Sequence, residues 1–325
     1  MTTMVRRRFL SAGLAAAAVA GSSAARAQAV LTKPVRMVVP YGVGGGADFS
    51  ARLIAQKLID QAGLKVIIDN KPGASGIVGT DFVAKSPADG SVLLYCDTTH
   101  ALNTAVNPKV PYDPVADFKP LTLIGRSPQL LVAHPSFPAN SLKELLAMPR
   151  EKTKDMAIGS SGLGSTPHMT YERLHLLTGL TLVHVPYKGG GPALSDAVTG
   201  QIPLVVNSIP ACIPHLQAKR LKPLALAAAE RNPRMPDVQT FAEAGAPLEV
   251  STWYGVLAPA RTPQDVADKL AREIERTLDD ADIKARFDET FLDPMPRGEQ
   301  AFAAFLAEEI AQWKAVATQT GVVVD

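Results

Sequence analysis

The segment from Val35 to Ile54 joins a strand, a glycine-rich turn and a helix in immediate succession. The apolar run Val35–Pro40 is typical of a buried strand, and Tyr41–Ala47 contains four glycines. Asp48 then opens a helical pattern. Such an arrangement presents unpaired backbone N–H groups at a helix N-terminus, where the helix dipole favours negative charge. The segment therefore predicts a loop that binds an anion.

The first 27 residues have the pattern of an export signal. The basic cluster Arg6–Arg8 precedes an apolar run, Ala12–Ala20, which is shorter than the about 20 residues of a membrane-spanning helix. Small residues at Ala25 and Ala27 mark a cleavage site, so we expect the mature chain to begin at Gln28 and to work in the periplasm. The basic cluster followed by Phe-Leu fits both the twin-arginine and the general secretory route, and both stay open.

The charge balance of the mature chain argues against a nucleic-acid partner. The full chain has 33 Lys and Arg against 31 Asp and Glu, and removal of the four signal arginines leaves 29 basic residues against the same 31 acidic ones. A nearly neutral chain without a basic block lacks the electrostatic footprint of a nucleic-acid-binding protein. About 300 residues are enough for two lobes, each with a hydrophobic core.

Short apolar runs alternate with helical patterns along the mature chain, which predicts a doubly wound α/β architecture. Several runs are continuous rather than alternating, as in sheets covered by helices on both faces. The expected strands are Val35–Val39, Val66–Ile68, Val92–Cys96, Leu121–Ile124, Leu130–Ala133, Met156–Gly159, Leu182–Val185, Ile202–Asn207, Leu224–Ala227 and Tyr254–Leu257. The expected helices include Asp48–Gln61, Ser141–Met148, Thr166–Leu177, Ile209–Ala218, Thr262–Leu278 with Thr262 as its cap, and Arg297–Thr318.

Two segments rich in Gly and Pro predict crossings between two lobes. Leu121–Ala133 has two apolar runs around Gly-Arg-Ser-Pro, and Pro247–Pro259 returns through Trp-Tyr-Gly. A chain that leaves one lobe near residue 129 and returns near 251 fits a two-lobed binding protein that closes on its ligand. The predicted division is 28–128 plus 252–325 for lobe 1 and 129–251 for lobe 2, each with a mostly parallel sheet flanked by helices.

A second loop of the same kind follows the strand that ends at Gly159. Ser160–Thr166 supplies hydroxyls and backbone amides, and His168 follows at the start of a helix, where the dipole favours an anion. One such loop on each side of a cleft suits a ligand with two carboxylates. An ordinary helix capped by Ser165 or Thr166 is the alternative interpretation. Farther along, Tyr187 precedes a third glycine turn, where it is a candidate to supply a hydroxyl to the ligand or a ring to the wall of the pocket.

The case for catalysis is thin. The first loop matches the dinucleotide fingerprint through Gly42, Gly44 and Ala47, with Asp69 ending the next strand. An exported protein meets little free nicotinamide cofactor, so no cofactor is expected. A dinucleotide-dependent oxidoreductase stays as the alternative. A serine hydrolase lacks its nucleophile elbow, because Leu163 stands where the final glycine is required. No pair of carboxylates stands out as an acid–base couple.

Histidines and cysteines do not predict a metal site. None of the six histidines lies in an HExxH motif or in a tight cluster with carboxylates. His168 remains a pocket candidate because it follows the second loop. Cys96 and Cys212 can pair in an oxidising compartment, but two separate buried thiols are favoured because cysteine is a common small core residue.

In this order, the segments resemble the Bug (TctC-like) family of periplasmic solute-binding proteins, which are associated with tripartite tricarboxylate transporters. The matching segments span the whole mature chain: Pro40–Asp48 resembles the family's first ligand loop, Asp69–Gly76 its "ENRPGAGG", Pro111–Phe118 its "PYDPxxDF", Ser160–His168 its "SSGxGSxxH", His184–Gly189 its "HVPYKG" and Trp253–Pro259 its "WxGLLAP". Together, at the family's spacing, these motifs are highly specific.

The resemblance implies a two-domain α/β Venus flytrap protein without catalytic activity, which captures a small carboxylate, amino acid or aromatic acid for a membrane transporter. A sensor subunit that presents its closed form to a receptor shares the same pocket and stays open as an alternative. A monomer is expected, because the cleft opens and closes within one chain. The implied or candidate ligand-binding residues are Tyr41, Gly44, Gly45, Gly46, Ala47, Asp48, Ser160, Ser161, Gly164, Ser165, Thr166, His168, Tyr187 and Asn207. Asp48 is interpreted as the helix cap rather than as a direct ligand group, since a carboxylate repels an anion.

The chain departs from the family pattern in two places. Gly42 and Val43 stand where the family has Pro or Ala, which implies a looser first loop. The family's "FDNLPS" appears as Val206–Ala211, so neutral Asn207 replaces an acidic group. A ligand ammonium would lose a partner there, which predicts a carboxylic acid without an essential amino group.

Overall fold

The computed structural model describes residues 33–295 and 297–324, and the structural statements below concern these residues. The predicted export signal lies outside them. None of the described helices has the length and apolar character that a membrane crossing requires.

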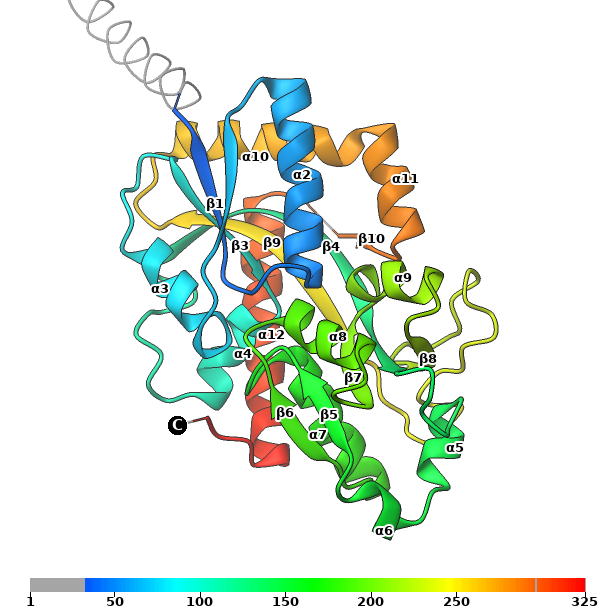
Figure 1. Cartoon of the computed structure of the whole chain (residues 1–325). Coiled ribbons are helices and arrows are strands. Elements are labelled where there is room, and N and C mark those ends of the chain that lie inside the picture. The colour runs from blue at the N-terminus through cyan, green and yellow to red at the C-terminus, as the bar shows by residue number, and fades with distance from the viewer. Residues whose placement is uncertain (1–32, 296, 325) are drawn as a thin grey trace, which may run out of the picture.

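The N-terminal strands form one half of the molecule (Figure 1). The strand order is β2 (Val66–Asn70), β1 (Val35–Val39), β3 (Val92–Asp97), β9 (Ser251–Pro259) and β4 (Phe118–Ala133), with β10 (Asp293–Pro294) beside β4. Strand β1 is parallel to β2 and β3, whereas β9 is antiparallel to β3 and β4. The helical elements of this half are α2 (Gly46–Ala62), η1 (Ala74–Gly76), α3 (Ile77–Ala84), α4 (Thr99–Val106), α10 (Gln264–Asp279) and α11 (Ala281–Glu289).

The second half continues from the other end of β4. Its strands are β7 (Leu204–Ser208), β5 (Ala157–Ser160), β6 (Val183–Pro186) and β8 (Lys222–Leu226), with β5 parallel to β6 and β7, and β4 antiparallel to β7 and β8. Its helices are α5 (Leu142–Leu146), α6 (Arg150–Thr153), α7 (Thr166–Thr178), α8 (Gly190–Val198) and α9 (Ile209–Gln217). The α/β fold has two lobes, as the sequence predicts.

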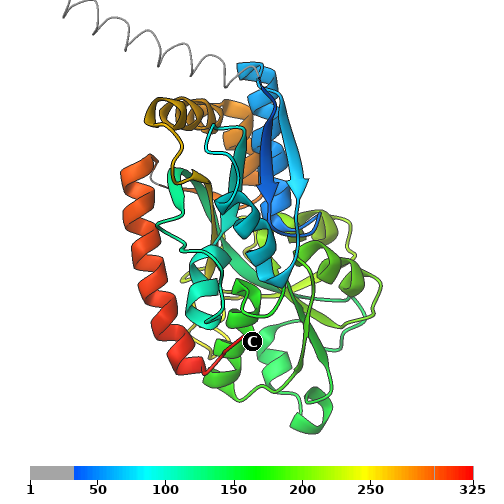
Figure 2. The same cartoon turned by 90° about the vertical axis from the view of Figure 1, so that its left-hand side faces the viewer.

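Strand β4 joins the two halves. Its first part pairs with β9 as far as Pro128 opposite Ser251, and its second part pairs with β7 from Gln129 onward. The prediction of two separate strands, Leu121–Ile124 and Leu130–Ala133, was wrong, because Gly125–Pro128 between them has ladder partners in β9. The last helix, α12 (Glu299–Thr320), runs alongside both halves (Figures 1 and 2).

Burial on both faces explains the continuous apolar strands. In β1, Met37 packs among side chains of α2 and α10, whereas the next residue, Val38, packs in a cluster on the other face of the sheet. Both side chains are fully buried. A strand covered on both faces has no need of the polar positions that would make it alternate. Cys96 and Cys212 are free thiols, each buried in a different core cluster, as the sequence favours.

Two predicted helix caps were wrong. Helix α2 begins at Gly46, two residues earlier than expected, with Gly45 at its cap and Asp48 inside its first turn. Helix α10 is capped by Pro263, because the Thr262 hydroxyl turns back to donate to the carbonyl of Pro259 at 2.7 Å instead of accepting from the helix. Ser165 does cap α7, as one of the two predicted alternatives.

Candidate functional site

Four helix N-termini converge on a cavity of about 30 Å³ between the two halves. The ends belong to α2 from the first half and to α7, α8 and α9 from the second. The cavity is lined by Tyr41, Gly45, Gly46, Ala47, Asp97, Ser161, Pro167, Gly190, Asn207, Ser208, Thr252 and Tyr254. Each helix end carries a partial positive charge, so this inner cavity favours an anion.

The first loop is held in place by Asp48. This carboxylate accepts the N–H of Gly44 at 3.0 Å, the Nε–H of Arg52 at 3.0 Å and the amide of Asn70 at 2.9 Å. Burial acts to raise the pKa of Asp48, but the hydrogen bonds from Arg52, Gly44 and Asn70 together hold it below its ordinary value. Asp48 is therefore a carboxylate that holds the shape of the loop. The amide of Gly44 donates to it and is not free to bind a ligand.

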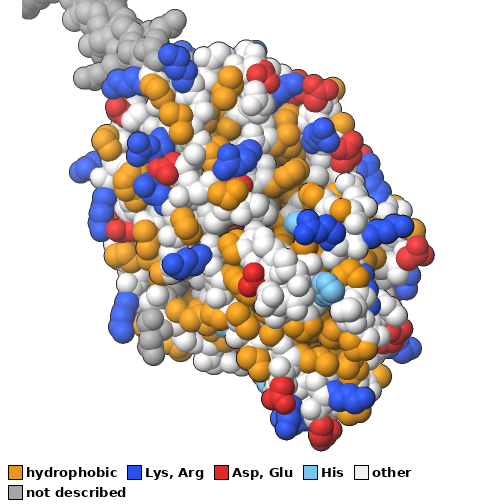
Figure 3. All heavy atoms as spheres, in the orientation of Figure 1, with side chains coloured by type: hydrophobic (Ala, Val, Ile, Leu, Met, Phe, Trp, Pro, Cys, Tyr) orange, Lys and Arg blue, Asp and Glu red, His pale blue; other side chains and the backbone are white. Residues whose placement is uncertain are grey.

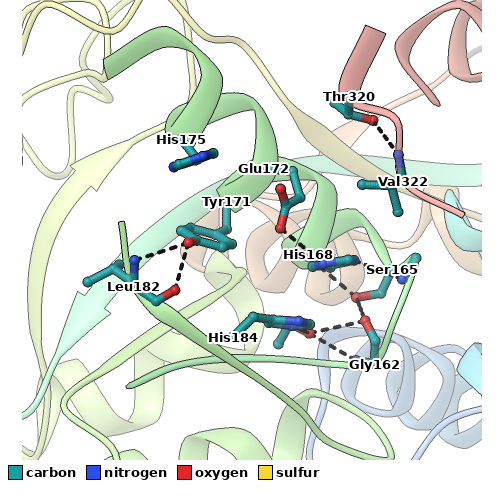
Figure 4. Close-up of polar contacts among 12 residues, drawn as sticks. Gly162, Ser165, His168, Tyr171, Glu172, His175, Leu182, His184, Thr320 and Val322 are labelled. Carbon is teal, nitrogen blue, oxygen red and sulfur yellow. Dashed lines mark hydrogen bonds and ion pairs between the residues drawn. The ribbon is translucent and has the colours of Figure 1, made fainter. Parts of the chain in front are cut away.

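The second loop is held by two stacked histidines (Figure 4). His168 Nδ1 accepts the N–H of Gly164 at 2.9 Å, while its Nε2 lies 3.3 Å from Glu172. The ring centroids of His184 and His168 lie 4.0 Å apart. Nε2 of His184 forms a hydrogen bond with the Ser160 hydroxyl at 2.7 Å. The amides of Gly162, Gly164 and Ser165 are engaged within the loop. Ser161 is the residue of this loop that lines the inner cavity.

The lobes meet directly beside the cavity. The N–H of Gly42 donates to the carbonyl of Lys188 at 3.0 Å. The Tyr254 hydroxyl donates to the Ser208 hydroxyl at 2.9 Å. The Ser75 hydroxyl donates to the carbonyl of Leu163. At Gly191, an added Cβ would collide with the carbonyl of the first loop, so the backbones approach as closely as glycine allows. The structure thus represents a closed arrangement of the lobes.

A second chamber of about 260 Å³ adjoins the first. The two share Tyr41 and Ser161. The walls of this outer chamber are mostly apolar, and they include Pro40, Gly73, Ala74, Ser75, Gly76, Ile77, Asn103, Val106, Asn107, Gly162, Leu163, Pro186, Tyr187, Lys188 and Val324. The C-terminal tail reaches this chamber because the N–H of Val324 donates to the carbonyl of Val106 at 2.7 Å.

The candidate residues from the sequence fall into three groups. Tyr41, Gly45, Gly46, Ala47, Ser161 and Asn207 line the inner cavity, and Tyr187 lines the outer chamber. Gly44, Asp48, Ser160, Gly164, Ser165, Thr166 and His168 line neither chamber. The amide of Asn207 is engaged by backbone, since its Nδ2 donates to the carbonyl of Gly190 at 3.1 Å and its Oδ1 accepts the N–H of Ser208 at 2.9 Å.

Sequence reasoning missed several lining residues, and Asp97 is the most consequential. Asp97 ends the parallel strand β3 and lies on the wall of the inner cavity. Its position was a usable signal, because ligands of open α/β sheets bind at the carboxyl ends of the strands. Val324 gave no such signal, since its contact with the chamber depends on the course of α12 over both lobes.

The described residues contain no cluster of three or more His, Cys, Asp or Glu that is able to hold a metal ion. On the face shown in Figure 3, basic side chains are interspersed with acidic ones. None of the residues that line the inner cavity is basic, so its attraction for an anion comes from the helix ends.

Comparison with known proteins agrees with this geometry. Residues 50–322 match the family model described as "Tripartite tricarboxylate transporter family receptor". Protein BugT of Bordetella pertussis is 33% identical over 89% of this chain and 90% of its own length. The R. palustris protein Rpa4515, solved with adipate, is 35% identical with a TM-score of 0.86, covering 90% of this chain and 98% of that one.

A further solved structure has another carboxylate bound. MatC from Rhodopseudomonas palustris, with bound malate, is 33% identical with a TM-score of 0.82, covering 87% of this chain and 98% of that one. The family match covers most of the chain, and the relatives are similar over nearly their whole lengths. The chain therefore belongs to the receptor family of the tripartite tricarboxylate transporters, the TctC or Bug family of solute-binding proteins.

Proposed function

We propose that this protein is an extracytoplasmic solute-binding protein that captures a small organic carboxylate between its lobes and delivers it to a membrane transporter. The observation that carries the proposal is the convergence of the N-termini of α2, α7, α8 and α9 on one cavity. The adipate and malate bound to two relatives support the same class of ligand. The family is one of binding proteins, so the oxidoreductase alternative is set aside.

The proposed roles of the site residues follow from where they lie. The amides of Gly45, Gly46 and Ala47 at the start of α2 hold the ligand carboxylate from one lobe, and Ser161 holds it from the other. Tyr41 separates the two chambers. The other candidates, Gly44, Asp48, Ser160, Gly164, Ser165, Thr166 and His168, fix the shape of the two loops, while Tyr187 and Asn207 line the outer and inner walls.

The lobes that close on the ligand are proposed to be 28–128 plus 252–325 and 129–251. The change of pairing partner along β4 at Pro128 and Gln129, together with the start of β9 at Ser251, supports these crossings. We further propose cleavage of an export signal after Ala27, action in the periplasm, and delivery to a tripartite membrane complex by a monomer. A sensor role would use the same pocket with a different membrane partner.

A thermal-shift screen of residues 28–325 tests the function. The panel contains mono-, di- and tricarboxylates, amino acids and nicotinamide cofactors. A ligand at about 100 times its dissociation constant adds about 2.7 kcal/mol to the free energy of unfolding, enough for a clear shift in Tm. We expect the shift with carboxylates. A shift confined to nicotinamide cofactors would refute the proposal.

Calorimetric titration of Ser161→Ala tests whether the ligand binds in the inner cavity. Loss of a hydrogen bond to a charged ligand weakens binding by about 1.5 kcal/mol, or roughly tenfold. The exposed Ser136, which lines neither chamber, provides the matched control Ser136→Ala, for which we expect unchanged affinity. Equal affinities of the two variants would place the ligand elsewhere.

A further inference from the structure

Asp97 puts a carboxylate on the wall of a cavity that otherwise favours anions. One of its oxygens, Oδ1, is fully engaged, since it accepts the Tyr41 hydroxyl at 2.6 Å and the N–H of Thr99 at 2.8 Å. These two bonds fix the orientation of the side chain. They also hold it at the carboxyl end of β3, opposite Tyr254 in the neighbouring strand.

The second oxygen of Asp97 is available to a ligand. The Thr99 hydroxyl also interacts with this carboxylate, but no described residue makes a hydrogen bond of normal geometry to Oδ2, and Oδ2 is not among the fully enclosed polar atoms that lack a partner. It therefore keeps access to the cavity that the side chain lines. An acceptor left open in this way makes binding more favourable for a ligand that brings it a donor. It makes binding less favourable for a ligand without a donor at that place.

The carboxylate of Asp97 has no basic counterpart on the wall of the inner cavity. None of the residues that line the inner cavity is a lysine or an arginine. Burial raises the pKa of Asp97, while the bonds from Tyr41 and Thr99 oppose that rise and favour the charged form. Because Oδ2 is an open acceptor, the ligand carboxylate is better placed toward the helix ends, and the part of the ligand that faces Asp97 is favoured when it carries a hydrogen-bond donor.

We infer that the ligand is a carboxylic acid with a hydrogen-bond donor, a hydroxyl or an ammonium, on the carbon next to its carboxylate, and that Asp97 Oδ2 accepts from this donor. This inference rests on the proposed function and narrows its substrate class. Asp97 lines the inner cavity together with the start of α2 and does not line the outer chamber, so the donor that it meets lies beside the carboxylate held there rather than at the far end of the ligand. It also revises the expectation from Asn207, whose amide is engaged by backbone, because the cavity obtains its acidic group from Asp97.

Matched acids test the inference by calorimetric titration of the wild-type mature chain. One series is succinate, malate and aspartate, and the other is propionate, lactate and alanine, with both enantiomers of each chiral acid. We expect at least tenfold tighter binding of a hydroxy or amino acid than of the acid without the donor. The hydroxy and amino members of each series show which of the two donors the site takes.

Two variants separate recognition from support of the fold. Asp97→Asn keeps an acceptor for Tyr41 and Thr99 but turns an N–H toward the cavity, so the preference should fall to less than about threefold. Tyr41→Phe removes one of the two donors that orient Asp97 but leaves the N–H of Thr99, so it should reduce the preference less than Asp97→Asn does. If Asp97 acted only by placing Tyr41, both variants would change binding in the same way.

The outcomes distinguish this inference from the proposed function. Carboxylates that bind without preference in the wild type, or a preference that survives Asp97→Asn, would overturn the role of Asp97 and leave the binding function intact. A chain that binds no carboxylate in either series or in the wider screen would overturn both. Circular dichroism and Tm of each variant establish that the comparison is made between folded proteins.

Discussion

Replacement of Gly191 by alanine is expected to weaken ligand binding by roughly 10- to 100-fold without destabilising the unliganded protein. The added Cβ would meet the carbonyl of Val43 in the first loop, which belongs to the other lobe. A backbone atom cannot turn away as a side chain does, so the lobes would have to stay apart. Overpacking of this kind costs about 1–3 kcal/mol, and each 1.4 kcal/mol is about tenfold in affinity.

The unliganded state should escape this penalty. Gly191 lies in the first turn of α8 and does not adopt a positive φ, so alanine fits its own backbone there. Alanine is also the better helix former by up to about 1 kcal/mol. The clash arises only when the lobes meet, and a change that acts on one of two states shifts their populations and lowers the apparent affinity.

Titration calorimetry and small-angle scattering measure the two parts of this prediction. We expect Gly191→Ala to show a higher Kd and a radius of gyration that no longer falls on addition of ligand, with an unchanged or higher Tm without ligand. The exposed Ser195, one turn further along α8, provides the control Ser195→Ala, for which we expect wild-type closure. Normal affinity in Gly191→Ala would show that closure does not need the contact with Val43.

The parts of the molecule that follow from local pattern were predictable from the sequence. Strand β1 has an apolar residue at nearly every position because both of its faces are covered. The glycine loops before α2 and α7 were found because a turn into a helix N-terminus has its own composition. These features depend on neighbours within a few residues, so a single sequence contains them.

The parts that depend on distant partners were not predictable. Gly125–Pro128 resembles a turn, yet it continues β4 because β9, more than 100 residues later, supplies ladder partners. The amides of Gly44 and Gly164 look free in a glycine loop, but Asp48 and His168 accept from them. An observer of the sequence sees how many donors a loop has, whereas the fold decides which of them remain for a ligand.

Acid is expected to destabilise this protein through His100. The side chain is 1% exposed, with its Nε2 2.9 Å from the carbonyl of Pro114 and its Nδ1 buried without a partner among the described residues. The ring stacks on Tyr112 and lies edge-on to Phe118. Burial lowers the pKa of His100 to about 4, because no nearby group compensates a charge there beyond the Pro114 carbonyl.

The direction of the pH dependence follows from the two states of the chain. In the unfolded chain a histidine has a pKa of about 6.5, so between pH 6.5 and 4 the unfolded state takes up a proton that the folded state does not. The contribution to stability is therefore complete above pH 6.5 and is lost as the pH falls toward 4. Its size is on the order of 3 kcal/mol, and His184, whose pKa burial also lowers to about 4, adds to the same loss.

Urea unfolding at a series of pH values from 7.5 to about 4 measures this loss. In His100→Gln, where an amide N–H can still donate to the Pro114 carbonyl, we expect the free energy of unfolding to fall by roughly 3 kcal/mol less across that range. Tyr112→Phe is the matched control, because it keeps an aromatic ring against His100 and leaves the titrating group in place. It should lower stability equally at every pH. A pH dependence that is the same in His100→Gln as in the wild type would mean that His100 takes up its proton without unfolding, by an opening of the Tyr112–Phe118 enclosure that leaves the rest of the core intact.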